Sequence, residues 1–237
     1  MRIIARIDIK NNHVIKGINL EGLRKIGDPK QIIEKYFNDG VDEIIINDSV
    51  ASLYGRNNLY DLIKDITQEV FIPITLGGGI RTLEDVQKAL DSGADKVAIN
   101  SGAFEDKKLI QNASKKFGSS TIVGYIEAKK INENNWEAYK FSGREKTGFK
   151  VQDWIKKLQN DGCGEILLTS VDNEGTEKGF DTDLINYLYD DVKCPIIFSG
   201  GCGSYKDIEE MKKKFPHEAI AIASVLHYKK VEIKKIK

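Results

Sequence analysis

The sequence predicts an α/β protein folded as a (β/α)8 TIM barrel, and three observations lead to this fold class. The chain has 237 residues, a common length for one barrel of this kind. Short apolar, β-branched runs alternate with charged amphipathic stretches, as in parallel sheets whose strands are joined by helices. Several of these segments then recur in the same order in the second half of the chain.

Eight short runs carry the strand pattern, which is the number that closes into a barrel. They are residues 2–10, 43–48, 74–76, 96–100, 121–128, 165–170, 196–199 and 219–223. Helical periodicity covers residues 29–39, 58–66, 83–92, 107–116, 150–161, 181–189 and 205–214. Glycines such as Gly40 and Gly162 follow several of these helices, where a left-handed cap is expected.

The internal repeat divides the chain into two similar halves. VDEIIINDS at 41–49 resembles CGEILLTSV at 163–171, ITLGGGI at 74–80 resembles IFSGGCG at 197–203, and ADKVAINS at 94–101 resembles EAIAIAS at 218–224. Asp8 matches Glu127 at nearly the same spacing. We therefore expect a single domain spanning residues 1–237, built from half-barrels at about residues 1–120 and 121–237.

Composition narrows the function classes. The 36 basic and 36 acidic residues cancel, which argues against nucleic acid and against a membrane surface as partners. We expect no signal peptide and no transmembrane span. Its three cysteines lack metal-ligand spacing and fit a reducing, cytoplasmic location. The three histidines form no metal-binding pattern, so neither a metal site nor a cofactor is expected.

Two glycine-rich turns predict phosphate sites. Gly78 and Gly79 follow a strand and precede a helix, and Asn100 and Ser101 end the next strand. Backbone N–H groups at such turns bind phosphate without net positive charge. The second half repeats the arrangement with Gly200, Gly201 and Ser224. The pair predicts a bisphosphorylated substrate that spans the barrel mouth; the alternative is that the glycines only make tight turns.

Two carboxylates are the candidate catalytic groups. Asp8 and Glu127 occupy matching strands, so they should face each other across the catalytic end of the barrel. Carboxylates among apolar strand residues are partly desolvated and suit general acid–base work. Thr169 and Glu174 lie at the end of the sixth strand and just after it, and Lys16, in the first loop, can meet a phosphate. The alternative roles are a structural carboxylate and a solvated loop lysine.

Four charged residues begin strands at the opposite end. Arg2, Glu43, Lys96 and Glu165 can meet as a neutral ring, since buried charges persist when paired. Such a ring either closes the barrel bottom or gates the entry of a small molecule. On the catalytic face, the polar segment 132–146 is either a lid over the substrate or a surface hairpin.

The chain resembles the cyclase subunit of imidazole glycerol phosphate synthase. The resemblance covers nearly the whole chain and rests on DIK at 8–10, VIKGIN at 14–19, GLRKIGDP at 22–29, GGGI at 77–80, ADKVAIN at 94–100 and GEILLTS at 164–170. It implies a barrel of duplicated halves that takes ammonia from a glutaminase subunit docked at the barrel bottom. The ammonia attacks a bisphosphorylated ribulosyl aminoimidazole-carboxamide nucleotide. The products are imidazole glycerol phosphate and an aminoimidazole carboxamide ribotide.

The resemblance also implies residue roles. Asp8 matches the first catalytic aspartate, Lys16 matches a loop lysine, and Asp95 matches an aspartate that faces the partner. The ring of Arg2, Glu43, Lys96 and Glu165 matches the ammonia gate. On this basis we expect an ammonia-dependent lyase of histidine biosynthesis that forms a heterodimer with a glutaminase.

Departures from the pattern keep three further functions open. Glu127 stands where the family has aspartate, Glu174 replaces another aspartate, and Arg6 replaces a small residue two positions before Asp8. Arg6 should point to the same side as Asp8. The changes resemble a paralogue that channels ammonia for amidination of an acetamido sugar in surface-polysaccharide synthesis. The second function is that of a related aminoaldose–ketose isomerase, and the third is that of a barrel that only activates its glutaminase.

Overall fold

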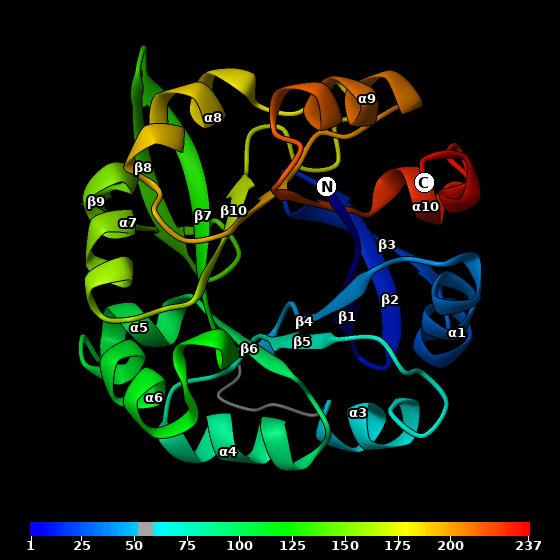
Figure 1. Cartoon of the computed structure of the whole chain (residues 1–237), viewed down its shortest axis with the longest axis horizontal. Coiled ribbons are helices and arrows are strands. Elements are labelled where there is room, and N and C mark those ends of the chain that lie inside the picture. Colours follow the sequence, from blue (N-terminus) through cyan, green and yellow to red (C-terminus); the bar gives the residue numbers. More distant parts are fainter. Residues whose placement is uncertain (52–58) are drawn as a thin grey trace.

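The computed structural model describes residues 1–51 and 59–237. Figure 1 looks along a closed barrel, with parallel strands around the centre and helices outside. The described residues supply eight barrel strands, β1 (Arg2–Lys10), β4 (Glu43–Asp48), β5 (Ile74–Gly77), β6 (Lys96–Ile99), β7 (Ile122–Asn132), β10 (Glu165–Ser170), β11 (Ile196–Ser199) and β12 (Ala219–Ile222). Each pairs in parallel with its neighbours, and the β7–β10 and β12–β1 pairs close the ring. The predicted (β/α)8 fold class is confirmed.

The helices lie outside the strands, close to where periodicity places them. They are α1 (Pro29–Asp39), α3 (Tyr60–Ile66), α4 (Leu83–Asp91), α5 (Ser101–Glu105), α6 (Leu109–Phe117), α7 (Val151–Asn160), α8 (Thr182–Leu188), α9 (Tyr205–Lys214) and α10 (Ser224–His227). Capping residues fix several starts: Asp28 accepts from the Gln31 N–H, while Thr82 and Ser204 each form a capping box. The first residue of the helix predicted at 58–66 lies outside the described residues.

Two antiparallel extensions rise from opposite strands of the barrel. β1 turns through Asn11 and Asn12, both at positive φ, into β2 (His13–Ile18) and then β3 (Glu21–Gly27). β7 continues likewise into β8 (Asn135–Lys140) and β9 (Glu145–Lys150). The placement of Lys16 in a loop is therefore wrong, because Lys16 lies in β2 and pairs with β3. The segment 132–146 forms the predicted hairpin, whereas its use as a lid stays a prediction.

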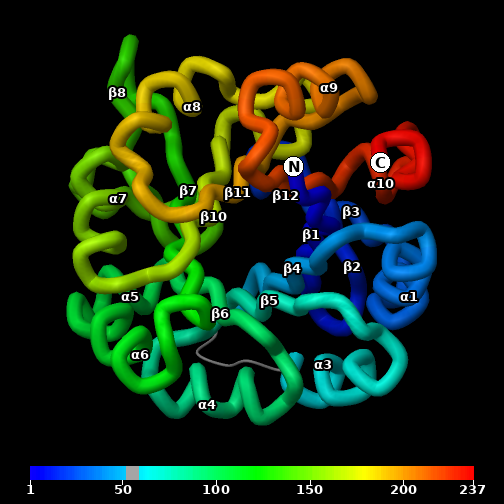
Figure 2. Tube along the Cα trace, viewed as in Figure 1, coloured from blue at the N-terminus to red at the C-terminus, as the bar shows by residue number. Residues whose placement is uncertain are grey.

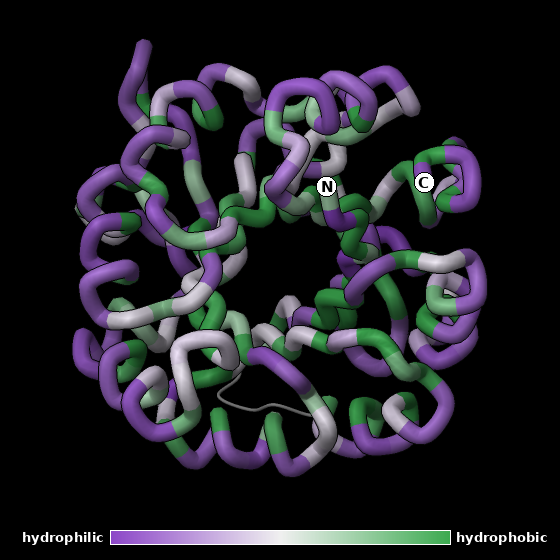
Figure 3. Tube along the Cα trace, viewed as in Figure 1, coloured by the Kyte–Doolittle hydropathy of each residue, from purple (hydrophilic) through white to green (hydrophobic). Residues whose placement is uncertain are grey.

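Apolar residues form two separate layers. The larger layer fills the space between strands and helices, and the outer surfaces of the helices are mainly hydrophilic (Figure 3). The smaller layer lies inside the barrel and consists of Ile4, Ile45, Ala98, Val123, Tyr125, Leu167, Ile197, Ala219 and Ala221. Figure 2 shows α10 beside α1, where the Tyr36 hydroxyl lies 2.7 Å from Nδ1 of His227. Among the residues described, none of the helices is long and apolar enough to cross a membrane.

Candidate active site

The two candidate catalytic carboxylates line one pocket at the carboxyl ends of the strands. Asp8 projects from β1 and Glu127 from β7, and both are buried, with 6% and 4% of their surface exposed. Lys16 and Arg6 line the same pocket. The free space enclosed there is only about 20 Å³, which is roughly the room that one water molecule needs.

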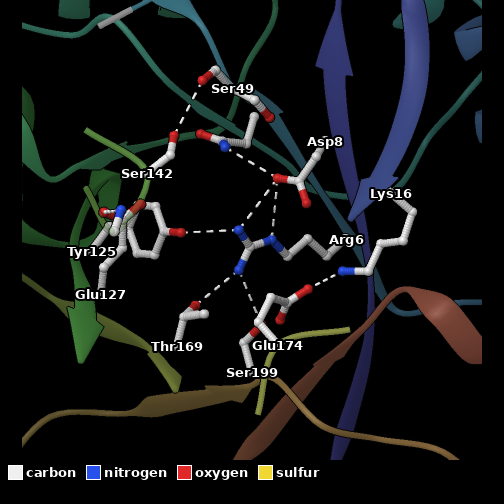
Figure 4. Close-up of polar contacts among 12 residues, drawn as sticks. Arg6, Asp8, Lys16, Ser49, Tyr125, Glu127, Ser142, Thr169, Glu174 and Ser199 are labelled. Carbon is white, nitrogen blue, oxygen red and sulfur yellow. Dashed lines mark hydrogen bonds and ion pairs between the residues drawn. The ribbon is translucent and has the colours of Figure 1, made fainter. Parts of the chain in front are cut away.

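Arg6 occupies the centre of this site (Figure 4). Its Nε and Nη2 atoms each lie 3.3 Å from Oδ1 of Asp8. Nη1 donates to the hydroxyls of Thr169 at 2.8 Å and Ser199 at 3.2 Å, and Nη2 donates to the Tyr125 hydroxyl at 2.9 Å. The predicted orientation of Arg6 toward Asp8 is thus confirmed, and the guanidinium uses all five of its N–H donors.

Burial and neighbouring charges shift the pKa of Asp8 in opposite directions. Burial favours the neutral acid, but the positive charges of Arg6 and Lys16, with a hydrogen bond from Asn47, outweigh burial and lower the pKa of Asp8. Nδ2 of Asn47 donates to Oδ1 of Asp8 at 3.1 Å. Asp8 is therefore an ionised carboxylate at neutral pH, and its Oδ1 atom accepts from both Arg6 and Asn47.

The pKa of Glu127 is shifted in the opposite direction, upward. Burial raises its pKa to about 7, although the backbone N–H of Gly143 and the charge of Arg6 act in the other direction. That N–H donates to Oε2 of Glu127 at 2.9 Å. A carboxyl group with a pKa near the working pH can both accept and donate a proton, so Glu127 is equipped for proton transfer where Asp8 is not.

Lys16 and Glu174 form a buried ion pair at the edge of the pocket. Both side chains are 4% exposed. Burial lowers the pKa of Lys16 to about 8, against the attraction of Asp8. Lys16 is therefore held by a carboxylate rather than free to meet a phosphate, and a ligand must compete with Glu174 for it. Thr169 likewise is already engaged, by Arg6.

The first glycine turn lies in a pocket of its own. Gly78, Gly79, Asn100 and Ser101 line this pocket together with Glu127. Gly78 and Gly79 have φ of 88° and 73°, values that favour glycine. A Cβ atom on Gly78 would lie 2.3 Å from the carbonyl oxygen of Asp48, so the turn tolerates no side chain there. The small turn and the start of α5 thus enclose one concave polar site.

The second glycine turn lies on the other side of the mouth. Gly200 and Gly201 follow β11, and Ser224 begins α10 after β12. Around the closed sheet, β11 stands opposite β5, and β12 stands opposite β6. Gly201 packs against Gly179, whose N–H donates to the Gly201 carbonyl at 2.8 Å. The two turns therefore flank the carboxylates from opposite sides.

At the other end of the barrel the four predicted charged residues form one ring. Arg2 pairs with Glu43 and Glu165. Nζ of Lys96 lies 3.0 Å from Oε2 of Glu43 and 2.9 Å from Oε2 of Glu165. Each carboxylate thus contacts both cations, and the ring closes the bottom of the barrel. Asp95, beside it, is exposed but accepts from the Ile74 N–H at 2.8 Å, so it also fastens the start of β5.

Several site residues were not predicted from the sequence. Tyr125 lies two positions before Glu127, as Arg6 lies before Asp8, so strand alternation alone places it on the inner face. Ser199 follows from the same alternation in β11. Ser142 and Gly143, from the turn between β8 and β9, carried no comparable signal, because their contacts depend on how the hairpin folds back.

Comparisons with known proteins identify relatives along the whole chain. Residues 2–232 match the family model described as "Histidine biosynthesis protein". The Imidazole glycerol phosphate synthase subunit HisF of Legionella pneumophila is 48% identical over 87% of this chain and 98% of its own length. The HisF subunits of Helicobacter hepaticus and Methanococcus vannielii are 42% and 40% identical over 100% of this chain, and over 93% and 94% of their own lengths.

Proposed function

The chain belongs to the histidine biosynthesis protein family, and from this premise we propose that it is the cyclase subunit of imidazole glycerol phosphate synthase. It uses ammonia from a glutaminase subunit to convert a bisphosphorylated ribulosyl aminoimidazole-carboxamide nucleotide. The products are imidazole glycerol phosphate and aminoimidazole carboxamide ribotide. Identity of 40–48% to HisF subunits over most or all of the chain supports this proposal.

The observation that carries the proposal is the arrangement of the mouth. One glycine turn lies at β5 and the other at β11, on opposite sides, with Asp8 and Glu127 in one pocket between them. One phosphate binds at Gly78, Gly79, Asn100 and Ser101, and the other at Gly200, Gly201 and Ser224. A molecule with a phosphate at each end then lies with its middle over the carboxylates.

The two carboxylates have different tasks. Asp8 stays ionised beside Arg6 and stabilises positive charge that develops when ammonia adds to the substrate. Glu127, with its pKa raised to about 7 by burial, takes up and returns protons during ring closure and cleavage. Separate protonation states in neighbouring carboxyls are a common way to divide acid and base roles.

The opposite end of the barrel receives the ammonia. The ring of Arg2, Glu43, Lys96 and Glu165 is the gate, and Asp95 faces the glutaminase. The ring is neutral overall, which suits the passage of neutral ammonia rather than an ion. No cofactor takes part in this scheme, which needs only ammonia, acid–base groups and phosphate contacts.

Turnover with ammonium salts at high pH tests this function without any partner. Wild-type protein should convert the ribulosyl nucleotide, and Glu127→Gln should lose most of that activity because it cannot exchange a proton. Absence of turnover in a folded sample that binds the nucleotide would contradict the proposal.

Arg6 favours a second candidate function. Its guanidinium fills the space between the carboxylates, and the remaining free volume there is about 20 Å³. A barrel of this kind can instead channel ammonia for amidination of an acetamido sugar in surface-polysaccharide synthesis. This candidate predicts glutaminase binding with little cyclase activity, and partial recovery of that activity in Glu127→Asp combined with Arg6→Cys.

A further inference from the structure

The side chains of Arg6 and Tyr125 meet inside the barrel, although they come from opposite strands. β7 is the fourth strand from β1 in either direction around the closed sheet. Nη2 of Arg6 nevertheless donates to the Tyr125 hydroxyl at 2.9 Å. The two side chains together therefore bridge the full width of the barrel, and we name this pair the crossbar.

The crossbar is fixed along its length. Arg6 is 1% exposed and Tyr125 is 4% exposed. Besides Tyr125, the guanidinium contacts Asp8 on its own strand, Thr169 on β10 and Ser199 on β11. Displacement of Arg6 would leave these groups without their partner in a buried site, which is costly.

The crossbar also has a defined level along the barrel axis. The charged ring closes the bottom, and the inner apolar layer lies above it. Ala221 belongs to that layer and pairs in register with Ile4 of the same layer and with Ser199, which Arg6 contacts. Arg6 lies two residues beyond Ile4 on β1, and Tyr125, itself a member of the layer, lies two residues beyond Val123 on β7. The crossbar therefore forms the boundary of the apolar layer on the side of the mouth.

We propose that the crossbar is a partition between the lower interior of the barrel and the mouth, and that a small neutral molecule passes it only when Arg6 is displaced. The identity of that molecule as ammonia rests on the proposed function, whereas the partition itself does not. The ring is then one of two closures in series, and the crossbar is the one that contacts a catalytic carboxylate.

Thiol labelling tests the partition without any enzymatic activity. Ala221→Cys places a thiol in the apolar layer, and methyl methanethiosulfonate, a small neutral reagent, serves as the probe. Removal of the crossbar by Arg6→Ala should speed labelling at position 221 by at least about tenfold, since each 1.4 kcal/mol of barrier accounts for that factor. Peptide mass spectrometry separates this thiol from Cys163, Cys194 and Cys202.

The natural cysteines provide the control. Cys194 is partly exposed and remote from the crossbar, so its labelling rate should be the same in both backgrounds. Equal rates at position 221 in folded protein would overturn the partition. If circular dichroism shows that Arg6→Ala does not fold, Tyr125→Ala removes the other half of the crossbar and decides by the same comparison.

The complex with a glutaminase gives a second readout. Ammonium added to the solution can enter from the mouth, whereas ammonia released at the barrel bottom must cross the partition. Arg6→Ala changes the chemistry at Asp8 whether the ammonia comes from glutamine or from added ammonium. The ratio of glutamine-dependent to ammonium-dependent turnover therefore reports only the passage of ammonia through the partition. The ratio should rise, and an unchanged ratio contradicts the partition. If wild-type protein shows no turnover with either glutamine or ammonium, the proposed function is refuted. The labelling rates at position 221 would then still test the partition.

Discussion

The backbone N–H of Gly143 donates to Oε2 of Glu127 at 2.9 Å, and this bond joins the hairpin on β7 to the carboxylate that is suited to proton transfer. Gly143 has a φ of 73°, and a Cβ atom there would lie 3.1 Å from Val171. The turn between β8 and β9 thus depends on glycine both for its conformation and for its fit.

We expect Gly143→Ala to displace this N–H from Glu127. The bond favours the ionised carboxylate, so its loss should raise the pKa of Glu127 further. In a pH profile of kcat/KM the limb that reports Glu127 should therefore move to higher pH, with a lower kcat. Gly148→Ala, another glycine at positive φ but remote from Glu127, is the matched control. A profile that moves equally in both variants would show a general effect of the hairpin.

Glu127 should also make the free energy of unfolding depend on pH. Its pKa rises from 4.5 to about 7 on folding, so the folded protein keeps a proton that the unfolded chain releases. The wild type should therefore lose about 3 kcal/mol relative to Glu127→Gln as pH rises from 4.5 to 7. Urea unfolding of both proteins across this range measures the difference. A difference that does not vary with pH would mean that burial does not perturb Glu127.

The Arg6–Asp8 pair should be strongly coupled. Arg6→Met leaves Asp8 buried without its main cation, and removal of one partner of a buried pair typically costs about 3–5 kcal/mol. Addition of Asp8→Asn should recover part of this loss, because the uncompensated charge is gone. A double-mutant cycle in urea measures the coupling, with Arg24→Met, at an exposed arginine, as the control. Additive losses would argue against a direct interaction.

At the barrel bottom, Lys96→Met should leave Glu43 and Glu165 with Arg2 alone. We expect a loss of about 2 kcal/mol, less than for a fully buried pair, because the Lys96 side chain keeps 19% of its surface exposed. Burial lowers its pKa, but Glu165 and Glu43 outweigh burial and raise it. The stabilisation should therefore be complete below pH 10.5 and fade only as pH rises through the higher folded pKa. Thermal unfolding against Lys88→Met, an exposed helix lysine, tests this expectation.

The sequence predicted the features that depend on local pattern. The alternation of β1 placed Arg6 and Asp8 on one face, and the repeat placed the glycine turns of β5 and β11 in equivalent positions. The contacts that join distant strands were not predictable in this way. The reach of Arg6 to Tyr125 depends on the width of the closed barrel, which no local pattern encodes.

The ion pair of Lys16 is another contact between distant segments that the sequence did not predict. The turn at Asn11 and Asn12 favours positive φ and indicates a hairpin, yet the strand that follows mixes buried and charged residues. The partner of Lys16, Glu174, lies 158 positions away in sequence. Only the three-dimensional fold brings this cation to a carboxylate instead of leaving it exposed in a loop.

The binding of one molecule by both glycine turns is the central claim, and a crystal structure with the bisphosphorylated nucleotide tests it most directly. The account predicts one phosphate against Gly79 and Ser101, the other against Gly201 and Ser224, and the middle of the molecule over Asp8 and Glu127. Both phosphates on one side of the mouth, or a nucleotide bound away from these carboxylates, would contradict it.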